Sequence, residues 1–417
     1  MRLSRPLVSI YCAGLLRSLG VGLLGVILAV YLSRAGVSTT SIGVVIGVGL
    51  LGACAATAWV TWACVRLGCR RTLVTLSLLA TVGGLVLAVL PSYPALLILV
   101  FVGMVNGMGT DRSAAFALEQ AVVPGLVPER SRTWALSWYN VLLDGGGAIG
   151  ALGAVLPLAV SAWARIDLLE AYRYVFLVYA SVHAVTALLY LTLPAGNQLL
   201  DSTEPAMREL VPSLQTRRTV HGIAKLFAID AFGGGLLSDA LVSYWFFHRF
   251  GMAEQSLGIL FFAVHILNAA SHLGAAWIAQ RIGLVNTMVF THLPSSIFLL
   301  LVPLASSAKW AIALFLLRET FVEMDVPTRQ SYVAALVKPH ERPYASGFTN
   351  ITRTGAWAAA SSISGLVMQR LAFSAPMLIG GLLKITYDLL LYRNFRHLKP
   401  PEELGVASSR SPSILRT

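Results

Sequence analysis

Charged and polar side chains stand inside long apolar stretches of this sequence. Arg17 and Asp230 each lie about 16 Å along such a stretch, at 1.5 Å per helical residue. An ionisable group this deep in a bilayer costs about 2.5–3.5 kcal/mol, so it usually faces a partner or a water-filled cavity. We expect Arg17 and Asp230 to lie near each other at the midplane and to bind substrate or couple to protons. A static ion pair that braces the structure is the alternative.

Other polar residues lie at comparable depth. Arg318 and Glu319 are adjacent, so on a helix they point in different directions and at most one should face a cavity centre. Cavity contact and bracing between helices both stay open for these residues. The candidates for substrate binding or coupling are Arg17, Asp230, Asn106, Asp144, Glu319, Glu323, Arg353, His265 and His272.

Histidines and cysteines are the candidate metal ligands. His265, Asn268 and His272 share one helix face by their i, i+3, i+7 spacing. Such a stripe could relay protons or form half of a metal site, but hydrogen bonding between helices is the interpretation we favour. We expect no disulfide framework, and we interpret the cysteines as small packing residues. We therefore assign no metal site. The cysteines are Cys12, Cys54, Cys64 and Cys69.

The composition places these residues in a membrane protein. The chain has 417 residues, of which 56% are hydrophobic and 12% charged, whereas soluble domains carry about 25% charged residues. About 20 apolar residues cross a bilayer as a helix, and twelve stretches meet that length. They are 7–32, 41–64, 72–91, 95–118, 134–163, 171–193, 220–247, 255–279, 285–305, 309–325, 344–369 and 373–392.

The distribution of Lys and Arg predicts the orientation. With an even number of passes both termini share one side, and most of the 31 basic residues fall on that side. Basic residues concentrate on the cytoplasmic side of membrane proteins, so we expect cytoplasmic termini in a multi-pass protein of the plasma membrane, specifically a bacterial inner membrane. The net charge of +12 then reflects topology and contact with the lipid bilayer, and we expect no nucleic-acid partner.

The sequence repeats itself once. Short matches recur in the same order at an offset of about 210 to 217 residues. This predicts two six-helix bundles in the same orientation, at 1–193 and 220–397, with a cytoplasmic linker at 194–219 and a tail at 398–417. The matching pairs are Arg17–Leu24 with Asp230–Leu237, Gly36–Gly43 with Gly251–Gly258, Arg66–Gly68 with Arg281–Gly283, and Ala135–Asn140 with Ala345–Asn350.

This repeat resembles the major facilitator superfamily, in bacterial members with twelve helices. Val65-Arg66-Leu67-Gly68-Cys69-Arg70-Arg71 is similar to that family's loop between helices 2 and 3, although the family's acidic position holds Val65. The segment that begins at Asp325 resembles the connection between helices 10 and 11. The glycines from Gly145 to Gly153 resemble a stretch of antiporter members. The resemblance implies gating roles for Arg66, Arg70, Asp111, Arg112, Asp325 and Arg329; helix-end charges that reach the interface are the alternative.

These observations predict an all-α secondary transporter that works by alternating access. We expect proton-coupled efflux of a small organic solute or toxic ion, by a monomer without a cofactor. Uptake of a nutrient or metal ion, or uniport, is the alternative. An embedded enzyme or a sensor is less favoured, because the sequence carries no hydrolase or Walker motif and no sizeable soluble domain.

Overall fold

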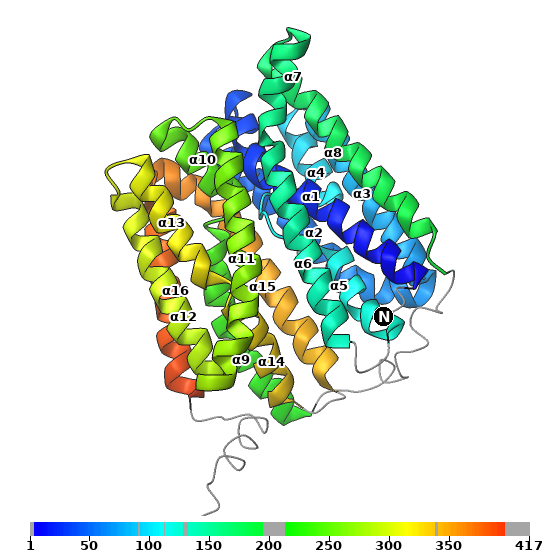
Figure 1. Ribbon diagram of the computed structural model, residues 1–417, viewed down its shortest axis with the longest axis vertical. Coiled ribbons are helices and arrows are strands. Elements are labelled where there is room, and N and C mark those ends of the chain that lie inside the picture. Colours follow the sequence, from blue (N-terminus) through cyan, green and yellow to red (C-terminus); the bar gives the residue numbers. More distant parts are fainter. Residues whose placement is uncertain are drawn as a thin grey trace, which may run out of the picture.

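The computed structural model describes residues 4–90, 92–111, 113–127, 132–194, 213–337 and 341–396. All regular elements of these residues are helices, which run back and forth in two bundles side by side (Figure 1). Nine stretches of the described chain are long and apolar enough to cross a membrane. α4 with α5, α13 with α14, and α15 also run along the bundles, which is consistent with the twelve predicted passes.

The N-terminal bundle runs from blue to green in Figure 1. It contains α1 (Arg5–Arg34), α2 (Thr39–Leu67), α3 (Cys69–Val89), α4 (Tyr93–Gly103), α5 (Ala114–Val122), α6 (Arg132–Leu152), α7 (Leu156–Ala164) and α8 (Leu168–Leu191). The C-terminal bundle runs from green to red. It contains α9 (Leu214–Gly235), α10 (Asp239–Phe250), α11 (Glu254–Ile282), α12 (Leu284–Leu301), α13 (Ala308–Val322), α14 (Asp325–Leu336), α15 (Arg342–Arg370) and α16 (Ala375–Phe395).

The backbone has the same geometry at one pair of repeat-related positions. Gly68 lies between α2 and α3, and Gly283 lies between α11 and α12. Their φ angles are 85° and 87°. A residue with a Cβ rarely adopts such angles, so glycine permits the tight turn. Much of the predicted linker at 194–219 and most of the C-terminal tail lie outside the described residues, although α9 already begins at Leu214.

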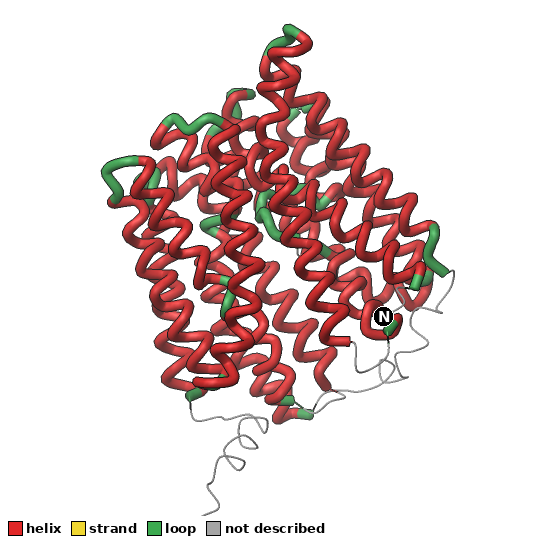
Figure 2. The backbone as a smooth tube through the Cα atoms, in the orientation of Figure 1, coloured by secondary structure: helices red, strands yellow, loops and turns green. Residues whose placement is uncertain are grey.

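Three predicted spans are not continuous helices (Figure 2). The span at 95–118 divides into α4 and α5, and the described residues between them, 104–111 and 113, are not helical. The span at 220–247 divides between α9 and α10, and the pass that begins at 309 divides between α13 and α14. The average hydropathy of a stretch did not reveal these breaks, because it reports how apolar the side chains are. It does not report whether the backbone hydrogen bonds of a helix continue along the stretch. Interrupted helices in both halves of a repeat are typical of a substrate site near the midplane.

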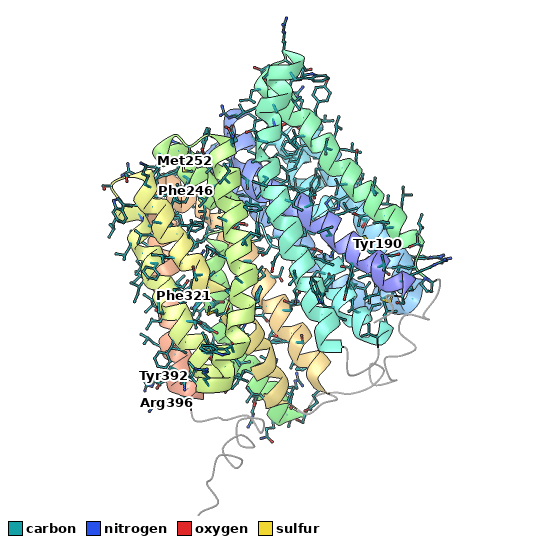
Figure 3. The ribbon with its side chains drawn as sticks, in the orientation of Figure 1. Tyr190, Phe246, Met252, Phe321, Tyr392 and Arg396 are labelled. Carbon is teal, nitrogen blue, oxygen red and sulfur yellow. A yellow bond between two sulfur atoms is a disulfide. The ribbon has the colours of Figure 1, made fainter. Side chains whose placement is uncertain are left out.

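The buried apolar side chains form a joint cluster at one end and separate clusters at the other. The joint cluster combines residues of both bundles, such as Tyr31, Trp245 and Phe246. A second cluster belongs to the N-terminal bundle and a third to the C-terminal bundle. Phe246 and Met252 mark the end with the joint cluster, and Tyr392 and Arg396 mark the opposite end of the C-terminal bundle, where α16 ends (Figure 3). The bundles are therefore packed together on the side away from the termini.

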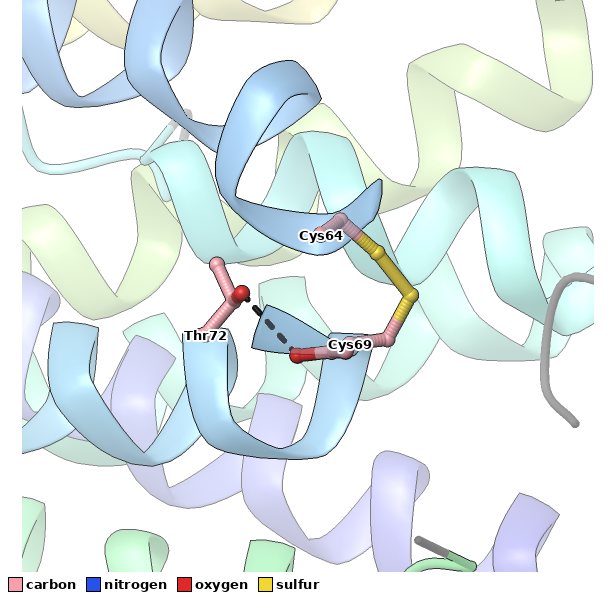
Figure 4. The surroundings of a disulfide bond; sticks show 4 residues. Cys64, Cys69 and Thr72 are labelled. Carbon is pink, nitrogen blue, oxygen red and sulfur yellow. Dashed lines mark hydrogen bonds between the residues drawn. A yellow bond between two sulfur atoms is a disulfide. The ribbon is translucent and has the colours of Figure 1, made fainter. Parts of the chain in front are cut away.

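The cysteine prediction was wrong for one pair. Cys64 and Cys69 form a disulfide across the turn between α2 and α3 (Figure 4). The turn at Gly68 brings their Cα atoms within 4.5 Å, and the Thr72 hydroxyl donates to the Gly68 carbonyl at 3.0 Å. Five residues of separation gave no sign of this pairing, because the turn geometry sets it.

Candidate functional site

The segment at 104–113 lies inside the N-terminal bundle. Asn106 shapes its start: its amide nitrogen donates to the Met104 carbonyl at 3.1 Å, and its side-chain oxygen accepts from the Met108 amide at 3.2 Å. Gly109 has a φ of 80°. Side-chain bonds of this kind offer the backbone an alternative to the helical ladder, so the chain unwinds here without losing its local hydrogen bonds.

This segment meets the break between α9 and α10 of the other bundle. The Gly107 carbonyl accepts from the Ala240 amide at 2.9 Å, which satisfies one of the first amides of α10. A Cβ on Gly109 would lie 1.7 Å from Oδ2 of Asp239, so only glycine allows this approach. The two interrupted helices thus join the bundles through backbone at the centre of the molecule.

A central cavity lies beside this junction. Met108 and Thr110 contribute from the N-terminal bundle, and the other lining residues come from the C-terminal bundle. Its charged lining residues are Asp230, Asp239, Glu319, Glu323, Asp325, Arg318, Arg329, Arg353 and Lys384, with His292, Asn268 and Trp357 among the uncharged or aromatic ones. The cavity therefore presents both signs of charge next to an interrupted backbone.

Asp230 is the centre of the C-terminal polar cluster, which we define as Asp230 with its basic neighbours and Asp388. The Lys384 ammonium lies 2.8 Å from Oδ1 of Asp230, and His292 Nε2 lies 3.6 Å from it. Arg329 and Arg353 approach the other carboxylate oxygen at 3.5 and 3.7 Å. His292 in turn contacts Asp388 at 2.9 Å. One carboxylate thus faces several basic groups at the cavity wall.

Arg17 is the centre of the N-terminal polar cluster, which we define as Arg17, Asp111, Glu119, Tyr139 and Tyr190. The guanidinium contacts Asp111 at 2.6 Å and Glu119 at 2.5 Å. It also donates to the Tyr190 and Tyr139 hydroxyls at 2.5 and 3.3 Å. Both hydroxyls donate to Glu119. This cluster is buried, and its donors and acceptors are matched within one bundle.

Arg17 and Asp230 do not pair with each other. The two residues occupy repeat-related positions, but they lie in different bundles. Each bundle supplies the partners of its own charged residue. Arg17 is 4% exposed and Asp230 is 3% exposed, so the expectation that both charges have buried partners holds. Depth along a span indicated that each needs a partner but did not identify it.

The histidine stripe on α11 contacts three different groups. His265 Nε2 lies 4.0 Å from Asp239, and His272 Nε2 lies 3.8 Å from Asp144 on α6. In the amide orientation that satisfies both groups, Asn268 donates to Glu319 at 3.3 Å. No three metal-ligating side chains of the described residues converge on one point. His265 and His272 therefore act as separate polar contacts, one of them across the bundles.

The expectation for Arg318 and Glu319 was wrong. They form an ion pair with each other, and both line the central cavity. The flexible side chains of Arg318 and Glu319 bend toward each other, although their Cα–Cβ bonds point in different directions on the helix. Glu323 ends α13 and Arg353 lies on α15, and both line the same cavity.

The predicted gating residues fall into two sets. Asp111, Asp325 and Arg329 are buried within the two polar clusters or beside them, and Arg329 pairs with Asp325. Their burial contradicts the alternative that they reach the interface as helix-end charges. Arg70 donates to the Leu193 carbonyl of its own bundle at 3.4 Å, and Arg66 is exposed at the end of α2. Arg112 lies outside the described residues.

Comparison with known proteins decides the family. The sequence profile described as Major Facilitator Superfamily matches residues 10–318 and 223–416. This chain belongs to the major facilitator superfamily. As a member it is a secondary transporter that works by alternating access.

Relatives and solved structures agree with this family. An uncharacterized membrane protein of Saccharomyces cerevisiae is 25% identical over 418 residues, which is 93% of each chain. The structure of a D-xylose–proton symporter matches with a TM-score of 0.73 at 15% identity, over 96% of this chain and 98% of that one. The human organic anion transporter MFSD10 matches with a TM-score of 0.65 at 18% identity, over 94% and 100%. At these identities the structures show the fold alone.

The superfamily fold is closed here on the side away from the termini. Arg34 at the end of α1 contacts Glu254 at the start of α11, with Nη2 2.7 Å from Oε1. The Tyr172 hydroxyl donates to the same oxygen at 2.8 Å. Glu254 is buried whereas Arg34 is partly exposed. This triad connects the two bundles at the closed end of the central cavity.

Several residues of the superfamily site escaped the sequence reasoning. Lys384 and Asp388 are two charges four residues apart inside the predicted last span, and Asp239 lies inside the seventh. Glu119 follows directly on the predicted end of the fourth. A complete census of ionisable residues within and beside the spans would have found all four, because each needs a buried partner.

Proposed function

We propose that this chain exports a small polar organic solute in exchange for protons. The observation that carries the proposal is the central cavity, which holds carboxylates and basic groups between two bundles whose buried apolar side chains form a joint cluster at one end and separate clusters at the other. Alternating access requires such a cavity and a contact that opens on one side as the other closes. Two halves of a single chain complete it, so we propose a monomer.

The charge distribution favours a solute that carries both charges. Asp230, Lys384 and Arg353 lie on one part of the wall, where basic groups outnumber the carboxylate. Asp239, Glu319 and Glu323 add acidic groups to the wall elsewhere. An anionic group of the solute would bind Lys384 and Arg353, and a cationic group would bind the acidic residues. Charge-assisted hydrogen bonds of both kinds give such a solute its affinity.

Asp239 with His265 is the proton site we propose. The two side chains lie 4.0 Å apart, one from α10 and one from α11, and both types of group exchange protons. Asp239 lies beside the backbone junction between the bundles. A change of its charge therefore acts where the bundles meet, which is what coupling to alternating access needs.

Direction and orientation are proposed from the sequence. The glycines of α6 resemble those of antiporters, which supports export, although they also let α6 pack closely on α1, since a Cβ on Gly150 would lie 2.0 Å from the Leu19 carbonyl oxygen. The distribution of Lys and Arg supports cytoplasmic termini in the plasma membrane. The curated relative is from yeast, so the bacterial inner membrane stays a prediction.

The test is flux in proteoliposomes with a pH-sensitive dye inside, screened with amino acids, nucleosides, sugars, organic cations and metal ions. The wild type should move protons when a zwitterionic solute is added. Asp239→Asn should lose proton-driven flux but keep solute exchange, whereas Asp230→Asn should lose both. Glu170→Gln, at an exposed carboxylate of α8, is the matched control and should behave as wild type.

Other results would change the proposal in defined ways. Solute flux without proton movement in the wild type would make the protein a uniporter. Proton and solute movement in the same direction would make it an uptake symporter. Transport of metal ions alone would reject the zwitterionic solute.

A further inference from the structure

A second cavity lies wholly within the N-terminal bundle. It is lined by α1, α3, α5, α8 and the non-helical stretch between α4 and α5. Much of its wall is apolar, with Val21, Leu24, Leu76, Ala80 and Met104. Apolar pockets with a few convergent polar groups are the usual form of a small-molecule site.

Two buried polar side chains in this wall lack hydrogen-bond partners among the described residues. Neither ring nitrogen of His183, which is 2% exposed, has a partner there, and the hydroxyl of Ser77, which is 3% exposed, has none either. The His183 ring packs on Tyr179 with centroids 4.5 Å apart. A buried polar group without a partner costs roughly 1–3 kcal/mol, so a molecule that bonds to them gains that stabilisation.

The repeat explains why the space exists. Ser77 lies nine residues after Gly68, as His292 lies nine after Gly283, so the two occupy equivalent positions on α3 and α12. In the C-terminal bundle the imidazole of His292 fills this position and reaches Asp388 and Lys384. Ser77 is much smaller. The N-terminal bundle thus keeps an opening where its counterpart holds a side-chain network.

The chemistry of the wall defines the ligand. Arg17 and Asp111 border the cavity, but their two charges are paired with each other, so the cavity wall presents no unpaired charge of either residue. An ion would enter a mostly apolar site without a counter-charge, at high cost. We propose that this cavity is a binding site for a small neutral molecule with an apolar ring and a hydroxyl group, which donates to His183 and accepts from Ser77.

The site lies against the transport machinery. Asn106 and Thr110 line this cavity, and Thr110 also lines the central cavity. The segment at 104–113 therefore separates the two. A molecule bound behind it holds the segment in the conformation that contacts α10, and slows any movement of the bundles that displaces it.

The test uses 4-fluorophenol and purified full-length protein, with binding followed by ¹⁹F NMR. The wild type should bind it saturably, and fluorobenzene, which lacks the hydroxyl, about five-fold more weakly, as expected for one hydrogen bond. Ser77→His fills the cavity and should abolish binding. His183→Phe keeps the volume and should weaken binding about five-fold. Leu78→Phe, on the exposed face of the same helix, is the matched control and should bind as wild type.

Two outcomes would overturn the proposal. One is the absence of saturable binding in the wild type, which would leave the cavity to water. The other is equal affinity in the wild type and in both His183→Phe and Ser77→His, checked for folding by thermal unfolding, which would place the ligand elsewhere. Binding is measured without transport, so this test stands or falls independently of the export proposal.

Discussion

The two polar clusters occupy repeat-related places but are built with opposite charges. In the N-terminal cluster one guanidinium is enclosed by two carboxylates and two phenols. In the C-terminal cluster one carboxylate is approached by Lys384, Arg329, Arg353 and His292 at the wall of the central cavity. The first is buried within one bundle, where the guanidinium bonds to both carboxylates and both phenols, and the second has an excess of basic groups around one carboxylate beside the central cavity. We infer that the first holds the fold and the second binds the solute.

Among the substitutions that test this comparison, Arg17→Leu should have the largest effect. It leaves Asp111 and Glu119 buried without their cation, which should destabilise the protein by about 3–5 kcal/mol. Thermal unfolding in detergent and the yield of folded protein measure this. An Arg17→Leu protein with wild-type stability and no transport would instead assign Arg17 to solute binding.

Asp230→Asn tests the role of the C-terminal polar cluster. Transport should fall about 100-fold, because the carboxylate that organises the basic groups is lost, an interaction of about 3 kcal/mol. The loss of stability should be smaller than for Arg17→Leu, because the basic groups border a cavity. Initial flux in proteoliposomes and thermal unfolding are compared. A larger loss of stability than in Arg17→Leu would reverse the two assignments.

Lys384→Met sharpens the role of the basic groups. It removes the cation that lies 2.8 Å from Asp230 and leaves Arg329, Arg353 and His292. Flux should fall about ten-fold, through weaker solute binding, as for one charge-assisted hydrogen bond. The apparent Km should rise more than the maximal rate falls, and an unchanged Km would argue against contact between Lys384 and the solute.

Tyr190→Phe has the smallest expected effect. It removes one hydroxyl that accepts from Arg17 and donates to Glu119, at a cost of about 1 kcal/mol. Thermal unfolding should show this loss while flux per folded molecule stays at the wild-type value. Reduced flux at unchanged stability would show that the N-terminal cluster takes part in transport.

The sequence was sufficient for the fold and for part of the site. The apolar stretches and the repeat predict two six-helix bundles, and depth along a span singled out Arg17 and Asp230. Their partners could not be predicted, because Glu119 is 102 residues from Arg17 and Lys384 is 154 from Asp230, and only packing brings them together. The break at 104–113 depends on Asn106 and Gly109, which change hydrogen bonding but hardly change average hydropathy.

The hydrogen bond from Ala240 to Gly107 has a consequence for how such a protein can diversify. Its donor and acceptor are both main-chain groups, so no side-chain replacement at the cavity wall removes either one. Exchanging Lys384, Glu323 or Asn268 for other residues would alter the cavity wall and leave this backbone contact between the bundles intact. The wall of the cavity and the backbone junction beside it can therefore change independently of each other.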